Sequence, residues 1–128
     1  MIEVLISILI FSFGILGAVG MQARVLQSST QNSDRSRASM LANELASQMW
    51  LQQKVDVTDP NLSPFYTAWQ TRVLTASVLG LPNATGTSTT SVIAGTTTNM
   101  ATITITWRPT TMSSTSIKNK FVTSVVIP

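Results

Sequence analysis

The stretch MIEVLISILIFSFGILGAVGMQ (residues 1–22) decides the fold, because apolar residues are far denser there than in the rest of the chain. No charged residue lies between Glu3 and Arg24. A helix of about 20 uncharged residues is ~30 Å long, which matches the hydrocarbon core of a bilayer. A soluble helix is rarely apolar on all sides over such a length. We therefore expect a membrane-spanning helix.

A cleaved signal peptide is the main alternative for this segment. Ala18, Val19 and Gly20 resemble a small-residue cleavage site, which would leave a mature chain starting at Met21. A signal peptide, however, begins with basic residues and has an apolar core of only ~7–15 residues. This segment begins with Glu3 and is longer, so the membrane-spanning interpretation fits better.

The orientation in the membrane stays open at this point. Arg24, Arg35 and Arg37 follow the apolar run, and positive charge favours the cytoplasmic side. Taken literally, this places the C-terminal part in the cytoplasm. The opposite orientation requires a basic segment before Met1.

Composition excludes several kinds of site. The eight basic and five acidic residues give a net charge of +3 and are scattered, so we expect no nucleic-acid partner. There is no Cys and no His, which excludes disulfides, zinc sites built on those residues, and Ser-His or Cys-His nucleophile pairs. Asp56 and Asp59 form the only close acidic pair. Calcium prefers six to eight oxygen ligands, so we interpret the pair as part of a loop.

These exclusions lead to three expectations about chemistry. We expect no metal and no other cofactor, and no small-molecule substrate. No glycine-rich phosphate-binding motif occurs in the sequence. The sequence therefore does not predict an enzyme.

After the apolar run, the helical pattern continues. An apolar stripe with helical spacing predicts a helix that packs on its own domain; its members are Ala38, Leu41, Ala42, Leu45, Ala46 and Met49. No proline occurs before Pro60, so one helix of ~50 residues, about 75 Å long, is predicted. Residues 31–37 are entirely polar, and we expect them to be solvated or to face a neighbouring subunit.

The remaining sequence predicts a short helix. Residues 56–64 form a loop by their Pro, Asn and Asp content. Ser63 is expected as the N-cap, with Pro64 at the first helical position. The helix is expected to end before Gly80 or Pro82 and to have one apolar face, formed by Phe65, Ala68, Trp69, Val73, Ala76 and Leu79.

Strands follow this helix. The stretch NATGTSTTS (residues 83–91) is expected to be a loop, and residues 91–94 a strand. Residues 100–107 alternate Thr with apolar residues, which predicts a half-buried strand. Residues 118–127 predict another strand, with Phe121 and Val125 on one face and the preceding PTTMSSTS as a hairpin loop.

Together these elements predict an α+β fold. A long N-terminal helix is expected to pack on a small antiparallel sheet of three or four strands. We expect residues 1–23 to form the transmembrane helix. Residues 24–128 form the globular domain, and its first part, residues 24–53, is the second half of the long helix.

Glu3 has two interpretations. An acid in the first turn of a helix complements the helix dipole by ~0.3–1 kcal/mol. Inserting an acidic side chain into a bilayer costs ~2.5–3.5 kcal/mol, and this cost suggests that Glu3 pairs with a cation. Charge alone does not separate these two.

The stretch IEVLISILIFSFGILG (residues 2–17) is similar to the N-terminal segment of type IV pilins and type II secretion pseudopilins. Mature chains of that family typically start Phe-Thr-Leu-Ile-Glu and continue as an apolar helix. Ile2 and Glu3 align with the family's Ile-Glu. The resemblance implies that the family's first two residues and its basic leader lie upstream of Met1, which would also place the domain outside the cytoplasm.

Three further stretches resemble PilV-type minor pilins, also called type IV pilus modification proteins. They are GILGAVGMQARVLQSSTQNSDRSRASMLANELASQMW (residues 14–50), AWQTRVLTASVLGLP (residues 68–82) and ATITITW (residues 101–107). The resemblance implies a pilin-like fold. It also implies that Glu3 pairs with the N-terminal amine of a neighbouring subunit during assembly. The apolar helix would hold the chain in the membrane and then in the filament core through Val4, Leu5, Ile8, Phe11, Gly14, Gly17 and Gly20.

The resemblance also implies partners and a location. The partners are other minor pilins, the major pilin, an inner-membrane assembly platform with its ATPase, and a leader peptidase. The location is the bacterial inner membrane, with a single pass and a periplasmic domain, and the cell exterior once the chain is in a pilus. The expected function is priming of pilus assembly, with roles in twitching motility, adhesion or DNA uptake. Two alternatives stay open: an I-type pseudopilin of type II secretion, and a membrane-anchored binding module that uses its Thr-rich strands.

Overall fold

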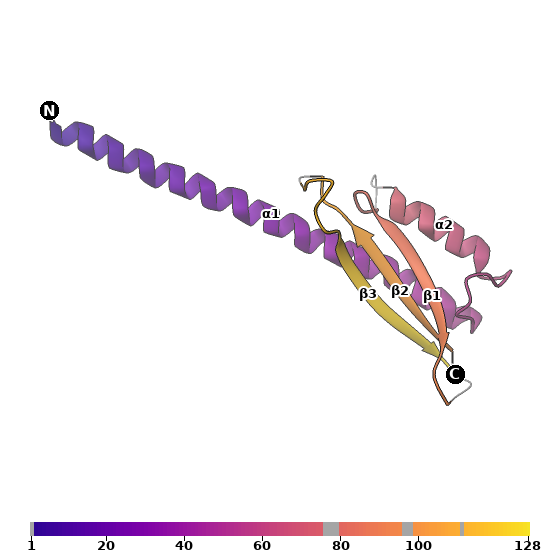
Figure 1. The fold of residues 1–128 in the computed structure, drawn as a ribbon. Helices are drawn as coiled ribbons and strands as arrows, with labels where there is room; N and C mark the ends of the chain where they lie inside the picture. The colour runs from indigo at the N-terminus through magenta and orange to yellow at the C-terminus, as the bar shows by residue number, and fades with distance from the viewer. Residues whose placement is uncertain (1, 76–79, 96–98, 111) are drawn as a thin grey trace. The chain divides into compact units, whose positions relative to one another are not determined.

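The computed structural model has an α+β fold (Figure 1), which confirms the predicted class. It describes residues 2–75, 80–95, 99–110 and 112–128. The elements are α1 (Ile2–Gln52), α2 (Ser63–Leu74), β1 (Thr85–Val92), β2 (Asn99–Trp107) and β3 (Asn119–Ile127). The chain divides into two compact units, Met1–Ser33 and Asp34–Pro128, and we describe each by itself. The predicted boundary at residue 23 is a different kind of boundary: it marks the end of the uncharged run, whereas the division after Ser33 separates compact units.

The sheet is antiparallel with the strand order β1-β2-β3. In its register Thr87 pairs with Thr104, and Ile103 pairs with Thr123. From Ala101 to Trp107, strand β2 alternates as predicted, with its Thr residues on the open face and its apolar residues buried. The buried residues are Ala101, Ile103, Ile105 and Trp107. The hairpin between β2 and β3 is also confirmed.

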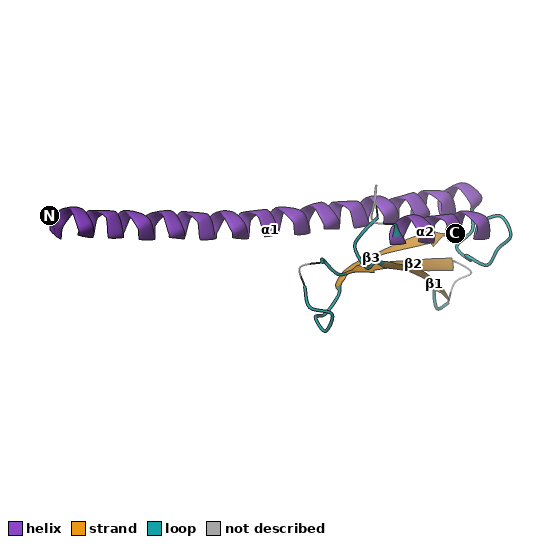
Figure 2. Cartoon of the chain, turned by 90° about the horizontal axis from the view of Figure 1, so that it is seen from above, coloured by secondary structure: helices purple, strands orange, loops and turns teal. Residues whose placement is uncertain are grey.

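Both helices cover the same face of the sheet, as Figure 2 shows for α2 and the last part of α1. The predicted stripe on α1 is confirmed, since all its residues are buried except Ala46, which packs at the margin of the core. Trp69 of α2 is fully buried, and its Nε1 donates a hydrogen bond of 2.7 Å to Leu41 O. An ion pair of 2.6 Å between Arg72 and Glu44 also joins the two helices.

Three predictions about α2 need correction. Leu62, not Ser63, occupies the N-cap position, and no side-chain hydrogen bond caps the helix. Ala68 is exposed rather than on the packed face. The helix ends at Leu74, because Thr75 has extended backbone angles, φ −84° and ψ 97°. The predicted face residues Ala76 and Leu79 lie outside the described residues.

The prediction of a loop at residues 83–91 was wrong. Strand β1 begins at Thr85 and ends at Val92, so the predicted strand at residues 91–94 is shifted. Thr residues favour strands, and β2 offers the pairing partner. Gly86 is required by packing, because a Cβ there would lie 2.6 Å from the Trp69 ring.

Residues 31–37 are not solvated throughout. Asp34 is only 5% exposed, whereas its neighbours in this stretch are exposed, apart from the half-buried Arg37. In the described part of the chain, no hydrogen bond or ion pair to the Asp34 side chain is found. Asp34 is buried because it lies one helical turn before Ala38, on the stripe that faces the sheet.

Candidate membrane-spanning and assembly segment

The first unit carries its apolar side chains on the outside. Every large apolar side chain from Ile2 to Leu26 is at least half exposed. So large an apolar surface is unusual for a soluble monomer. Helix α1 is long and apolar enough to cross a membrane, near the N-terminus of the chain. The length and the apolar composition expected of a membrane-spanning helix are confirmed.

The two serines of the apolar run are satisfied by the helix itself. Ser7 Oγ donates a hydrogen bond of 2.8 Å to Glu3 O, and Ser12 Oγ donates one of 2.7 Å to Ile8 O. A hydroxyl that bonds the carbonyl four residues earlier needs no water partner. The segment can therefore enter an apolar medium with few unsatisfied polar groups.

Glu3 lies in the first turn of α1, with its side chain exposed. In the described part of the chain, no side chain donates to its carboxylate. The structure thus places Glu3 at a helix end with positive dipole character and does not bring it together with another predicted site residue.

The other predicted assembly residues also face outward. Exposed side chains of this set are Val4, Leu5, Ile8 and Phe11. At Gly14, Gly17 and Gly20, an added Cβ would meet no atom within 4 Å. These glycines are therefore not required by packing within the described chain, unlike Gly86.

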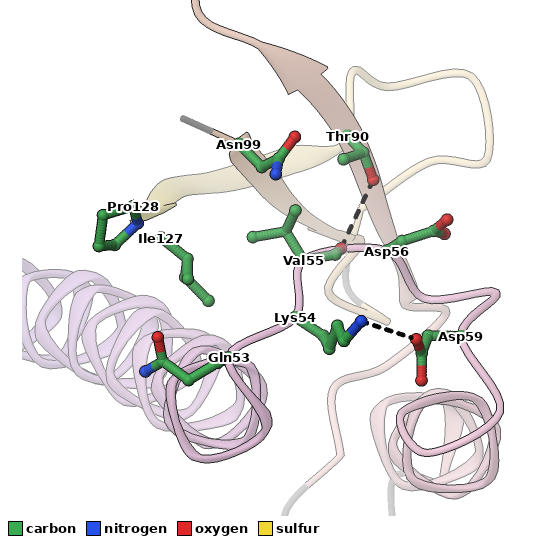
Figure 3. Close-up of a pocket in the computed structure, with 9 residues that line it drawn as sticks. All are labelled: Gln53, Lys54, Val55, Asp56, Asp59, Thr90, Asn99, Ile127 and Pro128. Atoms are coloured by element: carbon green, nitrogen blue, oxygen red, sulfur yellow. Dashed lines mark hydrogen bonds and ion pairs between the residues drawn. The ribbon is translucent and has the colours of Figure 1, made fainter. Parts of the chain in front are cut away.

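A polar hollow lies in the second unit, where the end of α1 meets the ends of the strands (Figure 3). Its volume is about 360 Å³. Its lining residues are Gln53, Lys54, Val55, Asp56, Asp59, Thr90, Asn99, Ile127 and Pro128. Lys54 Nζ lies 3.5 Å from Asp59 Oδ2, and Thr90 Oγ1 donates a 3.5 Å hydrogen bond to Val55 O.

The two acids of this hollow are engaged by their own loop. Asp56 Oδ1 accepts hydrogen bonds from Thr58 N at 2.9 Å and Thr58 Oγ1 at 2.7 Å. Asp59 Oδ1 accepts one from Asn61 N at 3.0 Å. The backbone N–H of Thr58 holds the pKa of Asp56 below its usual range, and that of Asn61 does the same for the pKa of Asp59. These contacts support the interpretation of residues 56–62 as a loop, whereas Ser63 and Pro64, which the predicted loop included, belong to α2.

Sequence reasoning missed several features of the second unit. It did not predict the Glu44–Arg72 pair, because no pattern links residues from two different helices. Among the described residues, buried polar atoms without a partner include Trp107 Nε1 and Ser88 Oγ, which also carry no sequence signal. The sequence predicted the strand at residues 118–127, but not that this strand lies at an edge of the sheet.

Comparisons with known proteins found no match among protein-family models, curated proteins or solved structures.

Proposed function

We propose that this chain is a minor pilin of the PilV type, a subunit that joins other minor pilins to prime assembly of a bacterial type IV pilus. The proposed work is assembly, not catalysis. The observation that carries the proposal is the pairing of two features in one helix. An exposed apolar segment begins with a lone acid, and the same helix later packs on a small antiparallel sheet.

Glu3 is proposed to set the axial position of the subunit. A carboxylate next to a bilayer or in a filament core is poorly solvated, so it attracts an ammonium group strongly, and either charge alone is costly. The N-terminal amine of a neighbouring subunit supplies that charge. The pair then favours one register between two parallel helices.

The apolar side chains around Glu3 are proposed to serve two environments in turn. In the inner membrane, Val4, Leu5, Ile8 and Phe11 contact lipid. In the filament they contact helices of other subunits. Gly14, Gly17 and Gly20 would allow a neighbouring helix to approach closely, because nothing within the chain fills the space beside them.

The proposed location follows from this role. The chain would sit in the bacterial inner membrane with a periplasmic domain, and outside the cell once it is in a pilus. Its partners would be other minor pilins, the major pilin, the assembly platform and a leader peptidase. Motility, adhesion or DNA uptake would be the cellular readouts.

Cysteine crosslinking tests the proposal directly, because the chain has no native Cys. A single-cysteine variant, Leu5→Cys, is expressed in its natural host from the gene with its own upstream sequence. We expect crosslinks to other pilus subunits in the envelope, and the chain in sheared filaments. Glu3→Gln should reduce the amount in filaments by at least about tenfold, since an unpaired buried charge costs ~3–5 kcal/mol.

The matched control is Glu44→Gln, which removes a charge from the same helix at its domain end. It should leave membrane insertion and filament incorporation unchanged. The proposal is overturned if no filament subunit is ever crosslinked at Leu5→Cys, or if Glu3→Gln and Glu44→Gln incorporate equally.

Two other functions compete with this one. An I-type pseudopilin of type II secretion would have the same fold, and a deletion strain would lose secretion while keeping its pili. A membrane-anchored binding module is favoured by the open face of the sheet, where Thr residues of β1 and β2 lie in register. They are Thr85, Thr87, Thr89, Thr102, Thr104 and Thr106. That function would survive Glu3→Gln.

A further inference from the structure

The two edges of the sheet differ in how their outer backbone groups are bound. Along β1, α2 supplies the partners. Gln70 Nε2 donates a 3.3 Å hydrogen bond to Gly86 O, and Ser88 N donates one of 3.2 Å to the Tyr66 hydroxyl. An added strand on this side would have to displace α2. The β1 edge is therefore closed at Gly86 and Ser88.

The same bonds reveal which residues of β3 face outward. In an antiparallel ladder, residues bonded to one neighbour alternate with residues that face the other way. Because the backbone groups of Gly86 and Ser88 face outward in β1, those of Thr87 form hydrogen bonds with Thr104 of β2. The next residue of β2, Ile103, therefore faces the other way and forms its backbone hydrogen bonds with Thr123, its partner in β3.

The outward residues of β3 are consequently the even-numbered ones. They are Lys120, Val122, Ser124 and Val126. Within the described ranges, no hydrogen bond reaches their outer N–H and C=O groups. Figure 1 shows no strand or helix continuing the sheet beyond β3. This edge presents a row of free donors and acceptors, the pattern to which another strand adds.

The side chains along this edge are suited to a partner. Strand β3 is nine residues long and contains no proline. Val122 and Val126 are 46% and 39% exposed, and Phe121 on the core face is only half-buried. A strand added beside β3 would cover these apolar groups.

The charge at this edge points to the kind of partner. No Asp or Glu occurs after Asp59, so the whole sheet lacks acids. Arg108 follows β2 directly, Lys118 directly precedes β3, and Lys120 is the second residue of β3. The pairing of Trp107 with Asn119 brings these three basic residues to one end of the sheet. A partner strand with a carboxylate at this end would be complementary.

We propose that the outer edge of β3 binds an extended acidic strand of a different protein, antiparallel to β3, with a carboxylate facing Lys120. A second copy of this chain fits less well, because its own β3 brings no acid to Lys120. The inference concerns residues 34–128 only. It does not rest on the proposed function, and either can fail alone.

A synthetic peptide, acetyl-VTTTVVE-amide, serves as the probe. In antiparallel register its first residue pairs with Val126 and its Glu faces Lys120. The control peptide, acetyl-VTTTVVK-amide, reverses that charge. Both are titrated into the isotope-labelled full chain in detergent micelles and followed by NMR. We expect the Glu peptide to bind at least about threefold more tightly at low salt. It should also slow amide exchange at Lys120, Val122, Ser124 and Val126.

Two variants separate edge binding from general effects. Ser124→Pro removes an outward N–H without breaking a β2–β3 bond, so it should retain the fold and weaken binding at least tenfold. Ser124→Ala, the matched control, should bind like the wild type. Lys120→Glu should reverse the preference, so that the Lys peptide binds more tightly, and this test does not depend on the tolerance of the strand for proline.

Three results would overturn the inference. The first is equal binding of the Glu and Lys peptides, or no binding of either. The second is a Lys120→Glu variant that still prefers the Glu peptide. The third is a dimer of the free chain in sedimentation that dissociates in Lys120→Glu or Ser124→Pro, because the occupant would then be a second copy.

Discussion

The two parts of helix α1 use apolar residues in opposite ways. Between Ile2 and Leu26 the large apolar side chains lie outside, on all sides of the helix. Between Ala38 and Met49 all of them except the exposed Met40 form one stripe, which is buried under the sheet. One helix therefore has an exposed apolar segment and a segment that packs in a core, and the spacing of the apolar residues distinguishes the two.

The largest expected effect comes from two leucines of the same helix. Leu45 is fully buried, whereas Leu9 is 57% exposed. Leu45→Ala should lower the free energy of unfolding of the domain by about 2–5 kcal/mol, because it leaves a cavity in the core. Leu9→Ala should change it by less than about 0.5 kcal/mol. Urea unfolding of the full chain in micelles, followed by tryptophan fluorescence, measures both, and equal losses would contradict the comparison.

Two glycines sharpen the same contrast with a smaller effect. In Gly86→Ala the new Cβ would lie 2.6 Å from the buried Trp69 ring, so we expect a loss of about 1–3 kcal/mol in the same unfolding experiment. Gly14→Ala meets no atom within 4 Å and should leave the domain unchanged. It should also favour the helix by ~1 kcal/mol. A tolerated Gly86→Ala would show that Trp69 can move.

The smallest expected effect is a change in the pH dependence of stability, and it comes from the exposed loop of the domain. The hydrogen bonds from Thr58 lower the pKa of Asp56 in the folded state. A depressed pKa stabilises the fold above the unfolded-state value of about 3.9, and this contribution is lost as the pH falls through the folded pKa. Asp56→Asn should therefore show a weaker decline of the urea midpoint below about pH 4 than the wild type. Identical pH profiles of the wild type and Asp56→Asn would exclude this contribution. Thr58→Val keeps the backbone donor but loses the hydroxyl, so its pH profile should lie between those of the wild type and Asp56→Asn.

Much of the fold could be predicted because its signals are local. The apolar stripe of α1 and the alternation in β2 are periodic within a few residues, and both predictions are confirmed. Strand β1 was missed because its Thr- and Ser-rich sequence has no apolar alternation, and its core-facing residues are small or polar. The end of α2 was misplaced because no proline or glycine marks Leu74.

The candidate assembly segment was predictable in its exposed, apolar character, and the role of Glu3 remains a proposal. The pattern of apolar residues is enough to tell the helix segment that is apolar on all sides from the one with a single apolar stripe, because helical periodicity is a property of neighbouring residues. The burial of Asp34, the Glu44–Arg72 pair and the contact of α2 with one sheet edge follow from tertiary contacts alone. Those features depend on residues brought together from distant positions, and no local pattern encodes them.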